Sequence, residues 1–233
     1  MLYLKGTLPR QREENPAGSR RFEGGGAVAT TVILVRHGET AWNLEQRYQG
    51  QEDSPLSDLG LFQARRVGQF LSKRPIAAVY TSDLGRAVQT AQLIAEHHQL
   101  TPTLDQRLRE MSFGVWEGLT RKEVAERYPE LYYGRLQDRS SHPIPGGEDP
   151  ADVVRRFRGC LEELVDRHAW ETIVVVSHGA ALRLTLAALL EIPLSRSQCL
   201  SQSNGGISEL AHSPKGSPCP WRVITINSTY HLL

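Results

Sequence analysis

Cysteine is scarce in this sequence, which has only Cys160, Cys199 and Cys219 in 233 residues. No two of them are spaced as Cys-x-x-Cys, so neither a disulfide framework nor a zinc site is expected. Few and scattered cysteines are typical of proteins from a reducing compartment. We therefore predict a cytoplasmic protein.

The sequence also lacks a long apolar run and an excess of either charge. Its most apolar stretch, residues 180–194, is interrupted by Arg183, Glu191 and Pro193, so it is too short and too charged to span a bilayer. The N-terminus has no apolar segment of the signal-peptide type. With 27 Lys and Arg against 26 Asp and Glu, the net charge of +1 leaves no strongly basic domain for a nucleic-acid backbone. Neither a membrane nor a nucleic acid is an expected partner.

Residues 1–30 lack the periodic apolar pattern of the remaining chain. They contain three consecutive glycines, two prolines and alternating charges. Such a segment buries too little apolar surface to offset the entropy lost on ordering, so we predict a flexible N-terminal arm. The folded domain is predicted to span residues 31–233, which is long enough for a sizeable hydrophobic core.

Short apolar runs alternate with amphipathic segments in this domain. The runs predict buried strands at residues 31–35, 76–80 and 173–176, and later strands at 207–210 and 223–226. Helices are predicted to begin at Ser57, at Ser82 or Asp83, and at Thr120, which act as N-caps, and to span residues 152–168 and 180–190. The alternation predicts an α/β fold, a three-layer α/β/α sandwich with a mostly parallel central sheet.

Three of the predicted strands are followed directly by side chains that bind or transfer phosphate. Arg36 and His37 follow the first strand, a loop ending at Arg86 follows the second, and His178 follows the third. Each alone is more often a loop or surface residue, but the carboxyl ends of parallel strands meet at one edge of a sheet. Guanidinium groups match a tetrahedral oxyanion, and neutral imidazole is a nitrogen nucleophile near pH 7. The pattern favours phosphoryl transfer without a metal, because the arginines supply the positive charge.

Longer strings surround these positions. They read Leu-Val-Arg-His-Gly-Glu-Thr at 34–40, Tyr-Thr-Ser-Asp-Leu-Gly-Arg at 80–86, Phe-Gly-Val-Trp-Glu-Gly at 113–118, Pro-Gly-Gly-Glu at 145–148 and Val-Ser-His-Gly at 176–179. In this order they resemble the histidine phosphatase superfamily, the phosphoglycerate mutase-like proteins. The resemblance covers roughly residues 31–233 and excludes the N-terminal arm. It implies the phosphoglycerate mutase-like fold.

The resemblance also implies a role for individual residues. His37 matches the nucleophile that forms a phosphohistidine, and Glu110 matches the proton donor, although Glu110 alone would be interpreted as a surface carboxylate. Positions that match phosphate-binding residues are Arg36, Asn43, Arg86 and His178, and positions that match the edge of the substrate pocket are Gln49, Gly50 and Gly179. A small phosphorylated metabolite is the implied partner, with no cofactor and no metal. Family members are monomers, dimers or tetramers, so a homodimer stays open.

The residues after Glu110 bear on the type of reaction. Mutases of the family carry Glu-Arg-His-Tyr-Gly there, whereas this sequence reads Glu-Met-Ser-Phe-Gly at 110–114. The missing Arg-His pair favours a phosphomonoester hydrolase that resembles broad-specificity, α-ribazole and metal-independent phosphoserine phosphatases, among which the motifs do not choose. A phosphoglycerate mutase is the less favoured alternative. A module that binds phosphate without catalysis is a third hypothesis, and the complete set of matched residues speaks against it.

The segment 111–147 is expected to meet the part of the substrate beyond the phosphate. Its aromatic residues predict a small core of their own, with stacking on a substrate ring as the alternative. Besides Arg36 and Arg86, no clear cluster of cations is evident in the sequence, which disfavours a bisphosphorylated sugar as the substrate.

Overall fold

One sheet organises the computed structural model, which describes residues 29–139, 141–213 and 217–233. Its strands are β1 Thr30–Arg36, β2 Ala78–Thr81, β3 Thr103–Leu104, β4 Thr172–Ser177, β5 Ile207–His212 and β6 Trp221–Ser228, in the spatial order β3-β2-β4-β1-β5-β6. The pairs β3–β2, β2–β4 and β4–β1 are parallel, whereas β5 is antiparallel to both β1 and β6. Only β5 therefore runs against the others, and the predicted mostly parallel sheet is confirmed.

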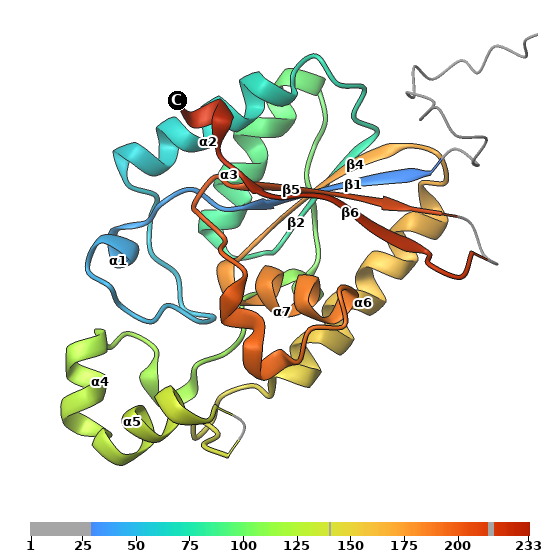
Figure 1. The fold of residues 1–233 in the computed structure, drawn as a ribbon. Helices are drawn as coiled ribbons and strands as arrows, with labels where there is room; N and C mark the ends of the chain where they lie inside the picture. The colour runs from blue at the N-terminus through green and yellow to red at the C-terminus, as the bar shows by residue number, and fades with distance from the viewer. Residues whose placement is uncertain (1–28, 140, 214–216) are drawn as a thin grey trace, which may run out of the picture.

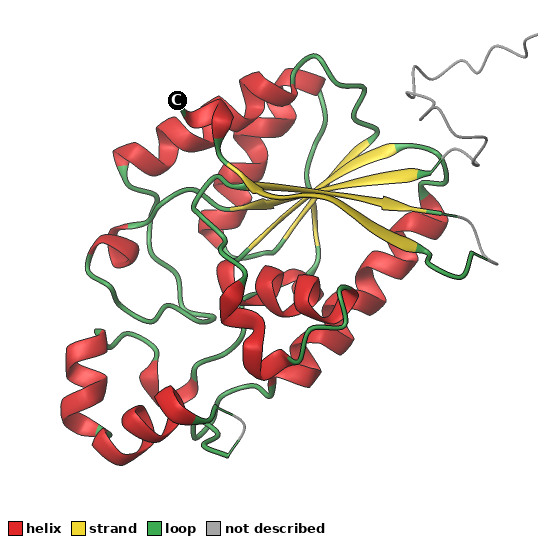
Figure 2. Ribbon diagram, viewed as in Figure 1, coloured by secondary structure: helices red, strands yellow, loops and turns green. Residues whose placement is uncertain are grey.

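Helices cover both faces of the sheet (Figures 1 and 2). The α-helices of the described residues are α1 Ala41–Leu44, α2 Asp58–Leu71, α3 Gly85–Ala95, α4 Arg121–Arg127, α5 Pro129–Gln137, α6 Pro150–Arg167 and α7 Gly179–Leu189. Figure 1 shows α2 and α3 on one face and α6 and α7 on the other, which gives the three layers of the predicted sandwich. Within the described ranges, no helix is long and apolar enough to cross a membrane.

Burial on both faces explains the continuous apolar run of β1. Val32 and Leu34 pack in the cluster formed with α6 and α7, whereas Ile33 and Val35 pack in the cluster formed with α2 and α3. Successive side chains of a strand point to opposite faces, so a strand between two helical layers is apolar at every position. All four side chains are fully buried. The same reasoning holds for β4, and these two central strands carry the residues that form the site.

The predicted N-cap residues can be compared with the observed first turns of the helices. The Ser57 hydroxyl accepts from the Gly60 N–H, and Thr120 and Glu123 form a capping box at α4, as predicted. The prediction for α3 was wrong, because the helix begins at Gly85 after Leu84, which provides no side-chain cap. Helix α6 begins two residues before the predicted Asp152, because Asp149 caps it by accepting from the Ala151 N–H.

The segment after Glu110 forms a small third core away from the sheet. Trp116, Val124 and Ile144 are its buried members, and Phe113, Tyr128 and Tyr132 are among the side chains packed on it. This confirms the small aromatic core predicted for residues 111–147. Figure 1 shows α4 and α5 at the side of the molecule next to α1, apart from the two helical layers.

The predicted N-terminal arm lies outside the described residues except for Ala29 and Thr30. Thr30 is the first residue of β1, and its hydroxyl donates to the His168 carbonyl (3.1 Å) and accepts from the Trp170 N–H (3.0 Å). The sheet therefore begins one residue earlier than predicted.

Candidate active site

The carboxyl ends of β1 and β4 bring the two predicted histidines together. Arg36 is opposite Ser177 in the parallel ladder, and the His37 N–H donates to the Ser177 carbonyl (2.9 Å). The imidazole rings of His37 and His178 follow at the ends of the two strands, with centroids 5.1 Å apart and ring planes inclined by 59°. The sheet edge predicted as the site is thus the place where these side chains meet.

His37 is buried and held in one tautomer. Its Nδ1 lies 2.6 Å from the Gly38 carbonyl oxygen, which only accepts, so Nδ1 carries the proton and Nε2 has a free lone pair. Burial lowers the pKa of His37 well below 6.5, and the nearby charges of Arg86 and Arg36 lower it further. The imidazole is therefore neutral at pH 7, which is the state of a nitrogen nucleophile.

Polar atoms without partners surround this ring. Both ring nitrogens of His178 and the Nε atoms of Arg36 and Arg86 are buried without a hydrogen-bond partner among the described residues. Burial also lowers the pKa of His178 well below 6.5, with Arg86 adding to the effect. A buried polar atom without a partner costs about 1–3 kcal/mol, so several at one place indicate a site that a polar ligand completes.

Both arginines are anchored on the side away from these free atoms. Arg36 Nη1 donates to the Gln202 carbonyl (2.6 Å), while Arg86 donates to the carbonyls of Glu52 (2.6 Å) and Gly50 (2.8 Å) and to Asp53 Oδ1 (3.0 Å). Burial lowers the pKa of Arg36 to about 10, so it keeps its charge at pH 7. The anchors orient two guanidinium groups for an oxyanion before it arrives.

Glu110 lies at the N-terminus of α7. Its Oε1 accepts from the backbone N–H groups of Met111 and Ala181 (both 2.8 Å), and its Oε2 accepts from Ala180 (3.0 Å). The side chain is buried, with only 8% of the residue exposed. Glu110 is thus not the surface carboxylate that the residue alone would suggest, but a buried carboxyl held by backbone N–H groups at the helix N-terminus.

The remaining predicted residues shape the edge of the site. The Asn43 amide oxygen accepts from the Thr40 N–H (3.2 Å) and from Asn204 Nδ2 (3.1 Å), which leaves the Asn43 NH₂ group to face the cavity that it lines. Gly50 has φ +55°, a conformation that favours glycine. A Cβ at Gly179 would lie 3.2 Å from Arg36 Nε, so the glycine lets the guanidinium pass the start of α7.

A cavity of about 330 Å³ joins these groups. It is lined by eight of the nine predicted site residues: Arg36, His37, Asn43, Gln49, Gly50, Arg86, Glu110 and Gly179. His178 does not line it and instead packs against the His37 ring as a fully buried side chain. The structure therefore brings all nine predicted residues to one place.

The cavity also contains residues that the sequence did not indicate. Arg47, Arg121 and Arg183 line it, so the expectation of no cation cluster besides Arg36 and Arg86 was wrong. Arg183 lies four residues after Gly179 on α7, a spacing that places both on one helix face, and this signal could have found it. Asn204 belongs to the loop before β5, and nothing in the sequence pattern indicated it.

Comparison with known proteins identifies the family. A family model described as the histidine phosphatase superfamily (branch 1) matches residues 32–228. The chain belongs to this superfamily. A relative named phosphoserine phosphatase 1, from Hydrogenobacter thermophilus, is 36% identical over 201 residues, which cover 86% of this chain and 93% of the relative. A Yersinia pestis relative named "Probable phosphoglycerate mutase GpmB" is 35% identical over 204 residues, which cover 86% and 94%.

Solved structures share the fold of this chain. Bacillus stearothermophilus YhfR matches with a TM-score of 0.82 and 33% identity, covering 88% of this chain and 100% of the other. A mycobacterial glucosyl-3-phosphoglycerate phosphatase in complex with VO3 matches with a TM-score of 0.77 and 31% identity, covering 85% and 99%. The predictions of the family, of the phosphoglycerate mutase-like fold and of a phosphatase are thereby confirmed.

Proposed function

We propose that this histidine phosphatase hydrolyses the phosphomonoester of a small metabolite through a phosphohistidine on His37, without a metal. The observation that carries the proposal is the neutral, buried His37, whose proton is held on Nδ1 by Gly38 while Nε2 is free. The cavity around it has two anchored arginines, which supply the positive charge for an oxyanion.

In the first step, His37 Nε2 attacks the phosphorus, a P–N bond forms and the bond from phosphorus to the leaving oxygen breaks. Glu110 gives its proton to that oxygen, because an alkoxide is a poor leaving group. As negative charge spreads over the three phosphoryl oxygens, these oxygens would be held by Arg36, Arg86, His178 and Asn43. The imidazole becomes positively charged, and the hydrogen bond from Nδ1 to Gly38 stabilises that charge.

In the second step, water attacks the phosphohistidine, the P–N bond breaks and Glu110 takes a proton from the water. Among the described residues, Glu110 Oε2 accepts one hydrogen bond, from the Ala180 N–H, which leaves a lone pair for that proton.

The hydrolase remains favoured over the mutase. The Yersinia pestis relative is named a probable mutase, but residues 110–114 of this chain lack the Arg-His pair of the family's mutases. An α-ribazole or phosphoserine phosphatase is a narrower version of the same proposal. The three cysteines are free thiols, which supports a cytoplasmic location. A homodimer is a separate hypothesis, which light scattering would test.

The proposal is tested by phosphate release in the presence of EDTA. The substrates are p-nitrophenyl phosphate, phosphoserine, α-ribazole phosphate, 3-phosphoglycerate and several sugar and nucleoside monophosphates. We expect turnover that EDTA does not reduce and an acid-labile phosphoenzyme that the His37→Asn variant does not form. Isomerisation of 3-phosphoglycerate faster than phosphate release would establish the mutase instead, and loss of all turnover in EDTA would refute metal independence.

A further inference from the structure

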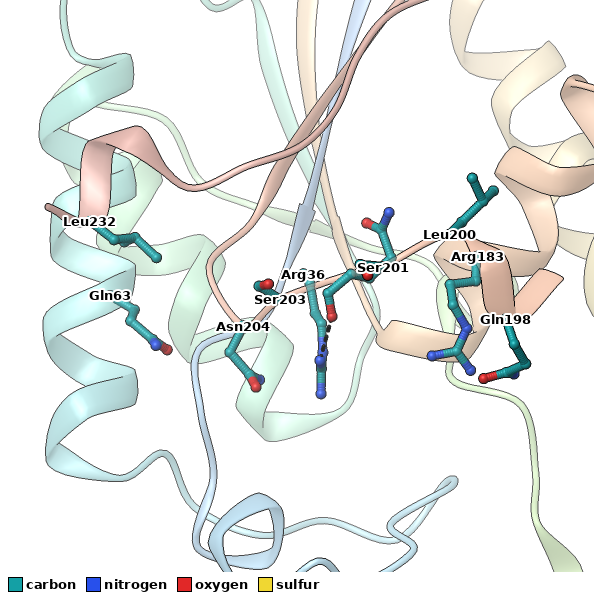
Figure 3. Close-up of a pocket in the computed structure, with 10 residues that line it drawn as sticks. Arg36, Gln63, Arg183, Gln198, Leu200, Ser201, Ser203, Asn204 and Leu232 are labelled. Carbon is teal, nitrogen blue, oxygen red and sulfur yellow. Dashed lines mark hydrogen bonds between the residues drawn. The ribbon is translucent and has the colours of Figure 1, made fainter.

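The cavity has a second group of arginines that the proposed chemistry does not use. Arg121 and Arg183 line it together with Glu110, and Arg183 also lines a neighbouring, more open pocket of about 590 Å³. Figure 3 shows that neighbouring pocket, with the side chains of Arg183 and Gln198 next to each other on one side and Arg36 between them and Asn204. Arg36, Arg183 and Asn204 line both spaces, so the two adjoin at this point.

Gln198 joins Arg183 to a further arginine, Arg139. With its amide oriented to satisfy both neighbours, its oxygen accepts from Arg183 Nη2 (3.1 Å) and from Arg139 Nη1 (2.5 Å). One neutral oxygen thus bridges two cations at a place where a carboxylate would form ion pairs with both. An amide oxygen carries only a partial charge, so this bridge leaves most of the positive charge of the pair uncompensated.

Arg121, Arg139 and Arg183 form no ion pair within 4 Å in the described part of the chain. Arg47 at the same cavity differs, because it pairs with Glu45 (2.8 Å) and Glu123 (3.3 Å). Glu110 is the carboxylate that lines the cavity with Arg121 and Arg183, and one carboxylate does not balance the charges of the three arginines. Gathering like charges is unfavourable, so this excess of positive charge beside the cavity indicates that a ligand supplies further negative charge.

The position of Glu110 indicates which part of a substrate these arginines meet. Arg183 is close enough to Glu110 and to Arg139 for their charges to act on it. Glu110 is the group that protonates the leaving oxygen in the proposed mechanism. Arg36 and Arg86 are also near Glu110, but their charges act on His37 as well, so they face the transferred phosphoryl group. Arg183 lines the cavity with Glu110 and extends to the neighbouring pocket, which places it toward the leaving group.

We propose that Arg121, Arg139 and Arg183 bind a second oxyanion, a carboxylate or a phosphate, on the leaving group of the substrate. This inference rests on the proposed function and narrows it to phosphomonoesters whose alcohol is itself anionic. Uncharged alcohols of the ribazole or simple sugar type would leave the three cations unpaired. Guanidinium groups bind both kinds of oxyanion with paired hydrogen bonds, so the experiment has to separate the two.

Matched substrates provide the first test. 3-Phosphoglycerate is compared with glycerol 3-phosphate for the carboxylate, and propane-1,3-diol bisphosphate with 3-hydroxypropyl phosphate for the second phosphate. We expect the anionic member of at least one pair to have a kcat/KM about 10- to 100-fold higher, mainly through KM, because each charge-assisted contact is made in the bound substrate as well as in the transition state. Equal values within both pairs would overturn the inference.

The Arg183→Gln variant provides the second test. It should reduce the preference for the anionic member by about 10-fold, while Arg183→Lys, which keeps a point charge, should reduce it less. The matched control is Arg158→Gln, an exposed arginine on α6 that bonds Glu162, and it should keep the wild-type preference. An equal loss for both members of a pair would mean that Arg183 acts on Glu110 and would overturn the inference. Wild-type protein that releases phosphate from no ester at all would instead refute the proposed function.

Discussion

The two ends of the cavity are built by different means. At the inner end, His37, Arg86 and His178 are at least 97% buried. The histidines directly follow the paired strands β1 and β4, and Arg86 lies in the first turn of α3. At the outer end, Arg121 begins α4 and Arg139 follows α5, in a segment whose core has only Trp116, Val124 and Ile144 as buried members. The structure of the phosphate-binding end therefore depends on the whole sheet, whereas the structure of the end that would select the substrate depends on a small separate core.

Replacing the proposed nucleophile should have the largest effect and would show how strongly chemistry is confined to the inner end. His37→Ala is expected to lower kcat by about 10⁴-fold or more for every phosphomonoester, because it removes the proposed nucleophile that forms the phosphoenzyme. The measurement is steady-state phosphate release, with far-UV circular dichroism to verify the fold. Turnover near the wild-type level would place the nucleophile elsewhere.

Glu110 lies between the two ends, and its replacement should separate substrates by leaving group. Glu110→Gln is expected to lower kcat by about 10²- to 10⁴-fold for alkyl phosphates and much less for p-nitrophenyl phosphate, whose leaving group needs no proton. The measurement is the ratio of the two losses. Because the NH₂ group of the introduced amide would meet the Ala180 N–H, thermal unfolding of the variant serves as control. Equal losses for both substrates would contradict the role as acid.

The buried histidines of the inner end should make the free energy of unfolding depend on pH. The arginines of the outer end should not contribute to this dependence. The pKa values of His37 and His178 are well below 6.5 in the folded protein, where burial disfavours the charged form. Above pH 6.5 both histidines are neutral in folded and unfolded chains. As pH falls below 6.5, the unfolded chain takes up protons that the folded protein does not.

The free energy of unfolding should therefore decrease by about 1.4 kcal/mol per pH unit for each of these histidines below pH 6.5. Urea unfolding at pH 7.5, 6.5 and 5.5 measures the slope. For His178→Gln, the slope of the unfolding free energy against pH should be smaller by the contribution of one histidine, about 1.4 kcal/mol per pH unit. The other histidines contribute equally to both proteins. An unchanged slope would show that His178 accepts a proton in the folded protein.

The same difference between the ends explains what the sequence could predict. Residues of the inner end follow directly on apolar runs whose length and composition identify buried strands, so Arg36, His37 and His178 are placed by the register of β1 and β4. Gln198 and Asn204 approach the cavity from a stretch without periodic pattern between α7 and β5. Asn204 reaches Asn43, 161 positions earlier, only after the fold has brought the two residues together.

Two elements that the sequence analysis did not predict, β3 and α5, were missed for a related reason. Strand β3 is two residues long with both side chains exposed, so it has no apolar run to reveal it. Helix α5 has no buried residue, and its apolar side chains do not form one face, which removes the periodic signal on which helix prediction depends. Arg139, which follows α5, could not be assigned to the cavity without the helix that positions it.

The smallest expected effect tests whether the outer segment is a separate unit. Thr120 caps α4 in the outer segment, and Asp149 caps α6 against the sheet, and removing either cap should cost about 1 kcal/mol. For Asp149→Ala this cost should appear as a decrease of about 2–4 °C in Tm, because α6 unfolds with the sheet. For Thr120→Ala we expect faster hydrogen exchange confined to α4 and a smaller decrease in Tm. If Thr120→Ala lowered Tm as much as Asp149→Ala, the segment would unfold together with the sheet, and the two ends would not be independent.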